Sequence, residues 1–272
     1  MNHLKKTNLI TVAPGEKIRL KNIDPSNKGA YKSKEEPAER HGQLHEKLSS
    51  LQERLYAECK QSLLIVFQAM DTGGKDGAAK KLLTGLNPAG ITVTSFKAPT
   101  SHELAHDFLW RIHAATPPRG TIAVWNRSHY EDVLITRVHK LIDKKTYKAR
   151  YDQINEFEAV LSASGTTILK FFLHISKDEQ KERLEARLAD PEKYWKFNPG
   201  DLKERAYWED YQEAYQDAIS ATSTAIAPWH VIPSNHKWAR DIAISEAVAR
   251  AFEKMNPQFP QVDFDPATIV VE

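Results

Sequence analysis

A glycine-rich loop between an apolar run and a helical stretch constrains the fold of this chain more than any other feature. The apolar run Ser62–Gln68 predicts a buried strand, and the loop Asp71-Thr72-Gly73-Gly74-Lys75-Asp76-Gly77 follows it closely. A helical stretch then extends to about Leu86. Glycines let successive N–H groups face one anion, and the positive end of the following helix adds to the attraction. The segment therefore predicts a phosphate-binding loop (P-loop).

The loop departs from the common P-loop pattern at two positions. Ala69 replaces the first glycine, and Asp76 replaces the hydroxyl residue that usually binds Mg²⁺. Asp71 is the natural replacement, because a carboxylate among phosphates repels them unless a cation lies between. Lys75 brings a full charge to the phosphates. The alternative is a glycine-rich turn without a ligand, and the lysine and the preceding strand argue against it.

Four more apolar runs alternate with helical stretches. They predict strands at 91–96, 121–125, 167–175 and 229–233. Such alternation is typical of a parallel sheet covered on both faces, whose ligands bind at the carboxyl ends of the strands. We therefore expect an α/β fold, a P-loop kinase-like three-layer sandwich with a five-stranded parallel sheet.

The rest of the chain predicts a simple domain organisation. Residues 1–40 are polar and form an N-terminal arm on the surface, residues 41–260 form the phosphotransferase domain, and residues 261–272 form a C-terminal tail. An arm of this kind can wrap a neighbouring subunit, so we expect a homo-oligomer.

Composition narrows the function. A net charge of +2 disfavours a general nucleic-acid binder, and no apolar stretch approaches the roughly 18 residues of a membrane span. The single cysteine excludes an intrachain disulfide, and no signal peptide precedes the domain. We expect a cytoplasmic protein without nucleic-acid or membrane partners.

A second polar cluster, residues 126–132, follows the third predicted strand. A carboxylate at such a strand end often supports Mg²⁺, but this chain has Asn126 there, and Arg127 can bind phosphate through two donors. Glu131 and Asp132 can hold metal, accept from a ribose or position Arg127. A capping box of Ser128 and Glu131 is an alternative that leaves Arg127 unexplained.

A basic helix is predicted over Lys177–Leu188, where Arg183 and Arg187 share one face. Taken alone, its mixed charges favour a solvated face of ion pairs. Its position after the fourth strand of a P-loop fold favours a basic lid, about residues 177–205, that closes over phosphates.

Six stretches of the chain together resemble the polyphosphate kinase type 2 family, and specifically its class III. They are 68–77, 85–88, 95–100, 106–111, 126–134, and Asp190-Pro191 with Trp195-Lys196. The resemblance extends over roughly residues 40–255. It implies transfer of phosphate from inorganic polyphosphate to AMP and ADP, or the reverse reaction, with Mg²⁺ and with Mn²⁺ as a substitute.

The resemblance also assigns site residues. Asp71, Lys75 and Arg127 are the expected catalytic residues, and Asp71 and Asp132 the expected metal ligands. The expected nucleotide-binding residues are Asn126, Glu131 and Arg137. The expected polyphosphate-binding residues are Thr72, Gly73, Gly74, Lys75, Asp76, Gly77, Lys80, Lys81, Arg127, Arg183 and Arg187.

Two other functions fit a nucleotide-binding α/β fold. An ATP-dependent kinase of a nucleoside monophosphate or small metabolite is disfavoured by the acidic loop without a hydroxyl after Lys75. A regulatory nucleotide switch without turnover is disfavoured because the sequence has no guanine-specificity motif of the usual form.

Overall fold

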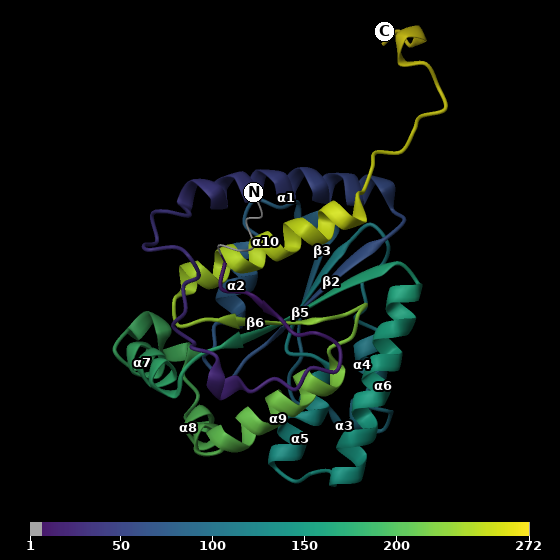
Figure 1. The fold of residues 1–272 in the computed structure, drawn as a ribbon. Helices are drawn as coiled ribbons and strands as arrows, with labels where there is room; N and C mark the ends of the chain where they lie inside the picture. The colour runs from purple at the N-terminus through teal and green to yellow at the C-terminus, as the bar shows by residue number, and fades with distance from the viewer. Residues whose placement is uncertain (1–6, 272) are drawn as a thin grey trace.

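Residues 7–271, described by a computed structural model, form one sheet between two layers of helices (Figure 1). The strand order is β1-β6-β5-β2-β4-β3. The five predicted strands are confirmed as the parallel part of the sheet, with small shifts of their ends. They are β2 (Ser62–Gln68), β3 (Ile91–Ser95), β4 (Ile122–Asn126), β5 (Thr166–His174) and β6 (Trp229–Pro233).

The prediction of five strands is wrong by one. A short strand in the arm, β1 (Ile10–Thr11), pairs antiparallel with β6 at the sheet edge. Val12, Ile18 and Leu20 from the same arm are buried, although most of the described arm residues are exposed, so the arm lies on the surface and a few side chains anchor it to the domain. A two-residue strand among polar residues gives too little periodicity to be predicted. Residues 1–6 of the predicted arm and Glu272 of the predicted tail lie outside the described residues.

Long helices cover both faces of the sheet. On one face lie α1 (Ala38–Glu58), α2 (Lys75–Leu82) and α10 (Lys237–Met255), and on the other α6 (Lys144–Ala163) and α9 (Trp208–Thr222) (Figure 1). Side chains alternate between the two faces of the sheet along β2. Leu63, Ile65 and Phe67 therefore pack against the first layer of helices, and Leu64 and Val66 pack against the second.

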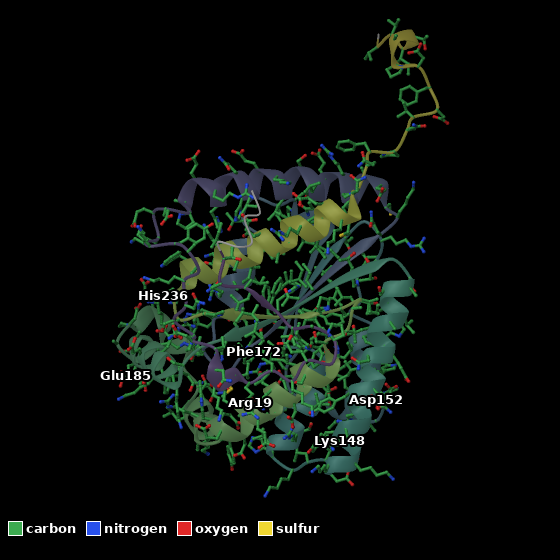
Figure 2. All side chains as sticks on the ribbon, in the orientation of Figure 1. Arg19, Lys148, Asp152, Phe172, Glu185 and His236 are labelled. Carbon is green, nitrogen blue, oxygen red and sulfur yellow. The ribbon has the colours of Figure 1, made fainter. Side chains whose placement is uncertain are left out.

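The interior between the layers is filled by side chains (Figure 2). Phe172 on β5 is buried there, whereas Lys148 and Asp152 on α6 are exposed. No helix in the described part of the chain is long and apolar enough to cross a membrane.

The sheet reverses its winding at β2. From β2 the chain first builds β3 and β4 on one side, and then crosses to β5 and β6 on the other. Loops that leave neighbouring strands in opposite directions open a crevice at their carboxyl ends. The glycine-rich loop follows β2 and the Arg127 segment follows β4, so both lie at this crevice.

The other described helices have 4 to 12 residues. They are α3 (Ser101–Leu104), α4 (Trp110–His113), α5 (Ile135–Val138), α7 (Lys177–Leu188) and α8 (Pro199–Ala206). The segments 101–115 and 199–222 each contain two helices, α3 with α4 and α8 with α9. The segment after Ser128 forms a 3-10 turn, His129–Val133, followed by α5.

Candidate active site

The glycine-rich loop curls tightly between β2 and α2. Gly74 has φ of 96°, and a Cβ there would lie 2.4 Å from Arg240 Nη1. A Cβ on Gly73 would lie 2.5 Å from the Cβ of Ala69. Both positions therefore require glycine. Thr72 also adopts a left-handed conformation (φ 60°), and its buried Oγ1 has no hydrogen-bond partner in residues 7–271. Strain and an unsatisfied hydroxyl at one loop are features of a ligand cradle.

Arg127 faces the loop from the end of β4. Its Nη2 donates to Asp71 Oδ1 at 2.8 Å, and its backbone N–H donates to Phe67 O at 3.1 Å. The backbone of Arg127 is left-handed, with φ of 63°, which turns the side chain back over the loop. The negative charge of Glu131 raises the pKa of Arg127 and outweighs burial, so this guanidinium stays charged.

Lys75 opens α2 beneath Arg127. Its Nζ donates to Ala69 O at 3.1 Å, so the ammonium group is held inside the curl of the loop. Burial, with the neighbouring charge of Arg127, lowers its pKa. An anion in the loop would relieve both effects, because it replaces lost solvation and screens the two cations from each other.

The predicted lid arginines lie beside the loop. Arg183 on α7 donates from Nη1 to Thr72 O at 3.1 Å and from Nη2 to Ser234 O at 2.6 Å. Arg187, one turn further along, donates to Lys196 O at 2.8 Å and lies 3.5 Å from Asp201. The first arginine is thus tied to the loop backbone, whereas the second joins α7 to the segment before α8.

These groups line one basic cleft of about 540 Å³. Eight lysines and arginines line it against three carboxylates, so a polyanion is the ligand that its charge favours. The cations are Lys75, Arg127, Arg183, Arg187, Lys193, Lys196, Lys237 and Arg240, and the carboxylates are Asp71, Asp76 and Asp201.

A smaller pocket of about 230 Å³ adjoins the basic cleft. Its lining includes four carboxylates (Asp71, Glu131, Asp201 and Glu204) and the aromatic side chains Tyr211 and Tyr215, and Arg127 is the one cation that the described residues contribute. The two cavities share Asp71, Arg127, Asn198 and Asp201. A ligand in the acidic pocket therefore meets a ligand in the basic cleft at the Arg127–Asp71 pair.

Several lining residues were not predicted from the sequence. Arg240 on α10 is almost fully buried and donates to Gly74 O at 3.3 Å, and Lys237 precedes it by one turn. In the smaller pocket, Tyr215 OH donates to Ala69 O at 3.0 Å, and Tyr211 OH donates to Glu204 Oε2 at 2.6 Å. A search for cations just after the last parallel strand would have found Lys237 and Arg240.

The structure does not bring four predicted residues to either cavity. Asp132 lies 3.8 Å from Arg150, and burial raises its pKa to about 6. Arg137 forms ion pairs with Asp217 (2.8 Å) and Glu213 (2.7 Å) on α9. Lys80 and Lys81 are exposed on the second half of α2 and line neither cavity.

The 3-10 turn explains where Asp132 lies. Ser128 caps the turn, with its Oγ accepting from Tyr130 N at 3.2 Å, but Glu131 N donates to Ser128 O at 3.1 Å, so the expected capping box is not formed. Glu131 then lines the smaller pocket, while Asp132 faces Arg150. Asn126 lies in the basic cleft, where its Nδ2 donates to Asp76 Oδ1.

A buried polar network anchors this turn. Lys170 on β5 donates to Glu158 Oε2 at 2.6 Å and to Tyr130 OH at 2.9 Å. Tyr130 OH donates to Glu158 Oε1 at 2.9 Å, and His129 Nε2 lies 3.3 Å from the same oxygen. Burial opposes ionisation of Glu158, but Lys170 and His129 hold its pKa below the ordinary value. The residues directly after Arg127 are thus fixed to the core.

The oxygen donors of the cleft are suitable for a hard cation. Asp71 accepts from Arg127 through Oδ1, and Asp76 lies within the same cleft. Among residues 7–271, no three His, Cys, Asp or Glu side chains converge as a ready metal cage. Mg²⁺ needs only one or two carboxylates when substrate phosphates and water complete its coordination. The donor set therefore fits Mg²⁺ held jointly by Asp71 and a phosphate.

A glycine loop after the central strand of a parallel sheet, with its lysine and facing arginines, defines a P-loop kinase-like phosphotransferase. The chain belongs to the Polyphosphate kinase 2 (PPK2) family, whose model matches residues 31–260.

Relatives along the whole length agree with this assignment. The chain is 48% identical to the AMP/ADP-polyphosphate phosphotransferase of Meiothermus ruber, over 96% of this chain and 98% of that protein. It is 43% identical to the ADP-polyphosphate phosphotransferase of Rhodopseudomonas palustris, over 94% and 93%. The crystal structure of Polyphosphate Kinase 2 from Arthrobacter aurescens TC1 superposes with a TM-score of 0.91 at 45% identity, covering 94% of this chain and 92% of that one.

Proposed function

We propose that this chain transfers phosphate from inorganic polyphosphate to AMP and ADP, or runs the reverse reaction, and so interconverts AMP, ADP and ATP. The observation that carries the proposal is the meeting of a basic cleft and an acidic pocket at Arg127 and Asp71. The names of the relatives from Meiothermus ruber and Rhodopseudomonas palustris support the same substrates.

The two cavities suit the two substrates differently. Polyphosphate has no base or sugar, so a long cationic cleft can bind it through charge alone. A nucleotide offers ribose hydroxyls, for which Glu131 and Glu204 are acceptors, and a base, against which Tyr211 can pack. We therefore place the donor in the basic cleft and the acceptor nucleoside in the smaller pocket, with the acceptor phosphate toward Arg127.

Catalysis then rests on positioning and electrostatics. The loop amides and Lys75 hold the terminal phosphates of the donor, and Arg183 fixes the loop backbone through Thr72 O. Arg127, held by Asp71 at 2.8 Å, neutralises charge on the phosphoryl group as it passes between the two ligands. Direct in-line transfer needs no phosphorylated side chain.

Mg²⁺, with Mn²⁺ as a substitute, is the metal of the proposal, and Asp71 is the residue that would hold it. When bound, the metal would neutralise charge on phosphate oxygens. Asp132 and Arg137 are not part of the proposed site, because they line neither cavity.

The proposal keeps three further expectations from the sequence. The segment 177–205 acts as a lid, since Arg187, Lys193 and Lys196 line the cleft from it. The domain extends over 41–260, although arm residues of the described chain complete its sheet. The enzyme works in the cytoplasm, where AMP and ADP occur, as a homo-oligomer.

Nucleotide analysis tests the function. The protein is incubated with Mg²⁺ and either AMP or ADP, with long-chain polyphosphate as the only donor, and nucleotides are separated by chromatography. We expect ADP and then ATP from AMP, and ATP from ADP. An enzyme that phosphorylates AMP only when ATP is the donor would instead be an ordinary nucleoside monophosphate kinase.

Variants test the roles of the site residues. Asp71→Asn and Lys75→Ala are expected to lower kcat by at least about 100-fold without lowering the thermal midpoint. Each variant removes a charged side chain that lies next to the phosphoryl group during transfer. Lys181→Met, an exposed change on α7, serves as the matched control and keeps wild-type activity. Near-normal turnover in either site variant would contradict the assigned roles.

A further inference from the structure

A third cavity lies at the opposite end of the sheet from the active site. Its volume is about 560 Å³, and it shares no residue with the two cavities described above. The first residues of β5 (Thr167–Leu169) and Gln61, just before β2, form its floor. Parallel strands start at the edge of the sheet opposite to their carboxyl ends, so this cavity and the basic cleft lie at opposite edges of the sheet.

The walls of this cavity are mostly apolar, with a basic rim. The apolar residues are Leu9, Ile168, Leu169, Ala225, Ile226, Pro228, Ala247, Ala251 and Met255. Arg250 and Lys254, both from the last turns of α10, add positive charge, and no Asp or Glu among residues 7–271 lines the cavity. Its preferred occupant is therefore an apolar segment that carries negative charge.

The segment after α10 has this composition. Residues 257–271, which we call the tail, include Asp263 and Asp265 and no Lys, Arg or His. Its exposed large apolar side chains are Phe259, Val262, Phe264, Ile269, Val270 and Val271. Figure 1 shows the tail standing clear of the domain beyond the ends of α1 and α10. Exposed apolar residues gathered in one segment mark an interaction site.

The start of the tail lies against the C-terminal end of α1. Gln258 N donates to Glu58 Oε1 at 3.3 Å, and Arg54 lies over the Phe259 ring at 6.0 Å, so α1 holds the start of the tail. The ion pair between Lys47 and Glu253 shows that this face of α10 packs against α1. The cavity is lined by Arg250, Ala251 and Lys254, on another face of α10, and no described residue of the tail lines the cavity of its own chain.

We propose that the tail of one copy of this chain docks in the cavity of a second copy. Acidic Asp263 and Asp265 would lie near Arg250 and Lys254, while the apolar residues Phe264 to Val271 fill the cavity. Tail and cavity both adjoin the end of α10, so a two-fold axis lets two chains exchange tails reciprocally and makes both contacts at once. Fifteen extended residues reach at most about 50 Å, which is enough to cross to a neighbour.

Charge reversal in the full-length protein tests the exchange. Self-association is measured by sedimentation velocity over a range of protein concentrations. We expect Lys254→Glu alone, and Asp263→Lys with Asp265→Lys, each to weaken the dimer by at least about tenfold, because each places like charges together. The combination of all three changes is expected to restore association. Lys21→Glu, an exposed reversal on the arm, is the matched control and leaves the dimer unchanged.

Two further readouts make the result decisive. All variants are expected to keep wild-type thermal midpoints and wild-type turnover per chain, since none of the changed residues lies at the active site. Hydrogen exchange of residues 264–271 is expected to slow as protein concentration rises. Slow exchange that persists at high dilution in a monomer would mean that the tail binds its own chain, and the proposal would be wrong. An oligomer that the tail and Lys254 changes do not affect would also overturn it.

Discussion

The buried ion pair of Lys170 and Glu158 offers a sharp test of how the fold holds the Arg127 segment. Lys170 Nζ makes three hydrogen bonds, to Glu158 Oε2 (2.6 Å), Thr222 O (2.7 Å) and Tyr130 OH (2.9 Å), and both charged side chains are at most 1% exposed. In Lys170→Met the apolar stem remains but the Glu158 carboxylate loses its cation. Breaking such a pair costs about 3–5 kcal/mol. That is a large share of the roughly 5–15 kcal/mol that stabilises a whole domain.

A double variant separates the lost charge from the lost shape. Lys170→Met with Glu158→Gln leaves no buried charge unpaired, and the amide can still accept from Tyr130 OH. We expect it to recover at least about 1 kcal/mol of the free energy of unfolding lost in the single variant. The control is Lys181→Met, whose ion pair with Glu185 is exposed, and its effect should stay within about 0.5 kcal/mol.

Urea denaturation followed by tryptophan fluorescence measures these differences, with the slope of each transition compared to confirm that the same surface is exposed. A decrease of less than about 1 kcal/mol in the free energy of unfolding of Lys170→Met would refute the reasoning, because a fully buried unpaired carboxylate costs more than that. A double variant less stable than the single variant would refute it as well.

Three other predictions follow from the structure. Glu204→Gln should raise KM for the nucleotide about tenfold with little change in KM for polyphosphate, and Lys237→Met should raise KM for polyphosphate with little change for the nucleotide. Initial rates measured with one substrate saturating distinguish the two variants. Equal effects of either variant on the two KM values would contradict the two-cavity assignment. Burial, with the charges of His45 and Lys81, lowers the pKa of His41 to about 4. The stability that neutral His41 contributes is therefore complete above about pH 6.5 and is lost as pH falls toward 4. His41→Gln should reduce this loss, as measured by urea denaturation across that pH range. Burial raises the pKa of Asp132 to about 6, so its contribution to stability is complete below about pH 3.8 and is lost as pH rises through 6. Asp132→Asn should therefore gain stability relative to wild type across that window. A changed dependence of the variant's activity on Mg²⁺ concentration would contradict this and indicate that Asp132 is a metal ligand.

The sequence predicted the part of the site that lies in local patterns. The apolar run Ser62–Gln68 and the glycines after it define strand, curl and helix without any distant contact, and the structure has the same elements. The rule that ligands bind at the carboxyl ends of parallel strands then placed Arg127 in the same cleft as Lys75 correctly, although the two residues are 52 positions apart in the sequence.

Residues that depend on an irregular backbone could not be placed in this way. The left-handed Arg127 and the 3-10 turn after it direct Asp132 toward Arg150, and the local sequence pattern indicates neither feature. Arg240 joins the loop only because α10 begins at the end of the last parallel strand, so its role depends on the order of strands in the sheet. The edge strand β1 is too short to carry a periodic signal.

The same limit applied to the arm. Its polar composition predicted a surface segment but did not reveal that a few apolar side chains, Val12, Ile18 and Leu20, anchor it to its own domain. The arm is therefore no longer the reason to expect an oligomer. The exposed apolar side chains of the tail replace it.

Transfer of labelled phosphate tests the central claim most directly. Polyphosphate labelled with ³²P is incubated with the enzyme, Mg²⁺ and unlabelled AMP, and nucleotides are separated from the phosphate chain by thin-layer chromatography. We predict that the label enters the β-phosphate of ADP first and the γ-phosphate of ATP later, and that neither product is labelled with Lys75→Ala. Label that appears only as orthophosphate, or AMP that remains unlabelled in every form, would contradict the account.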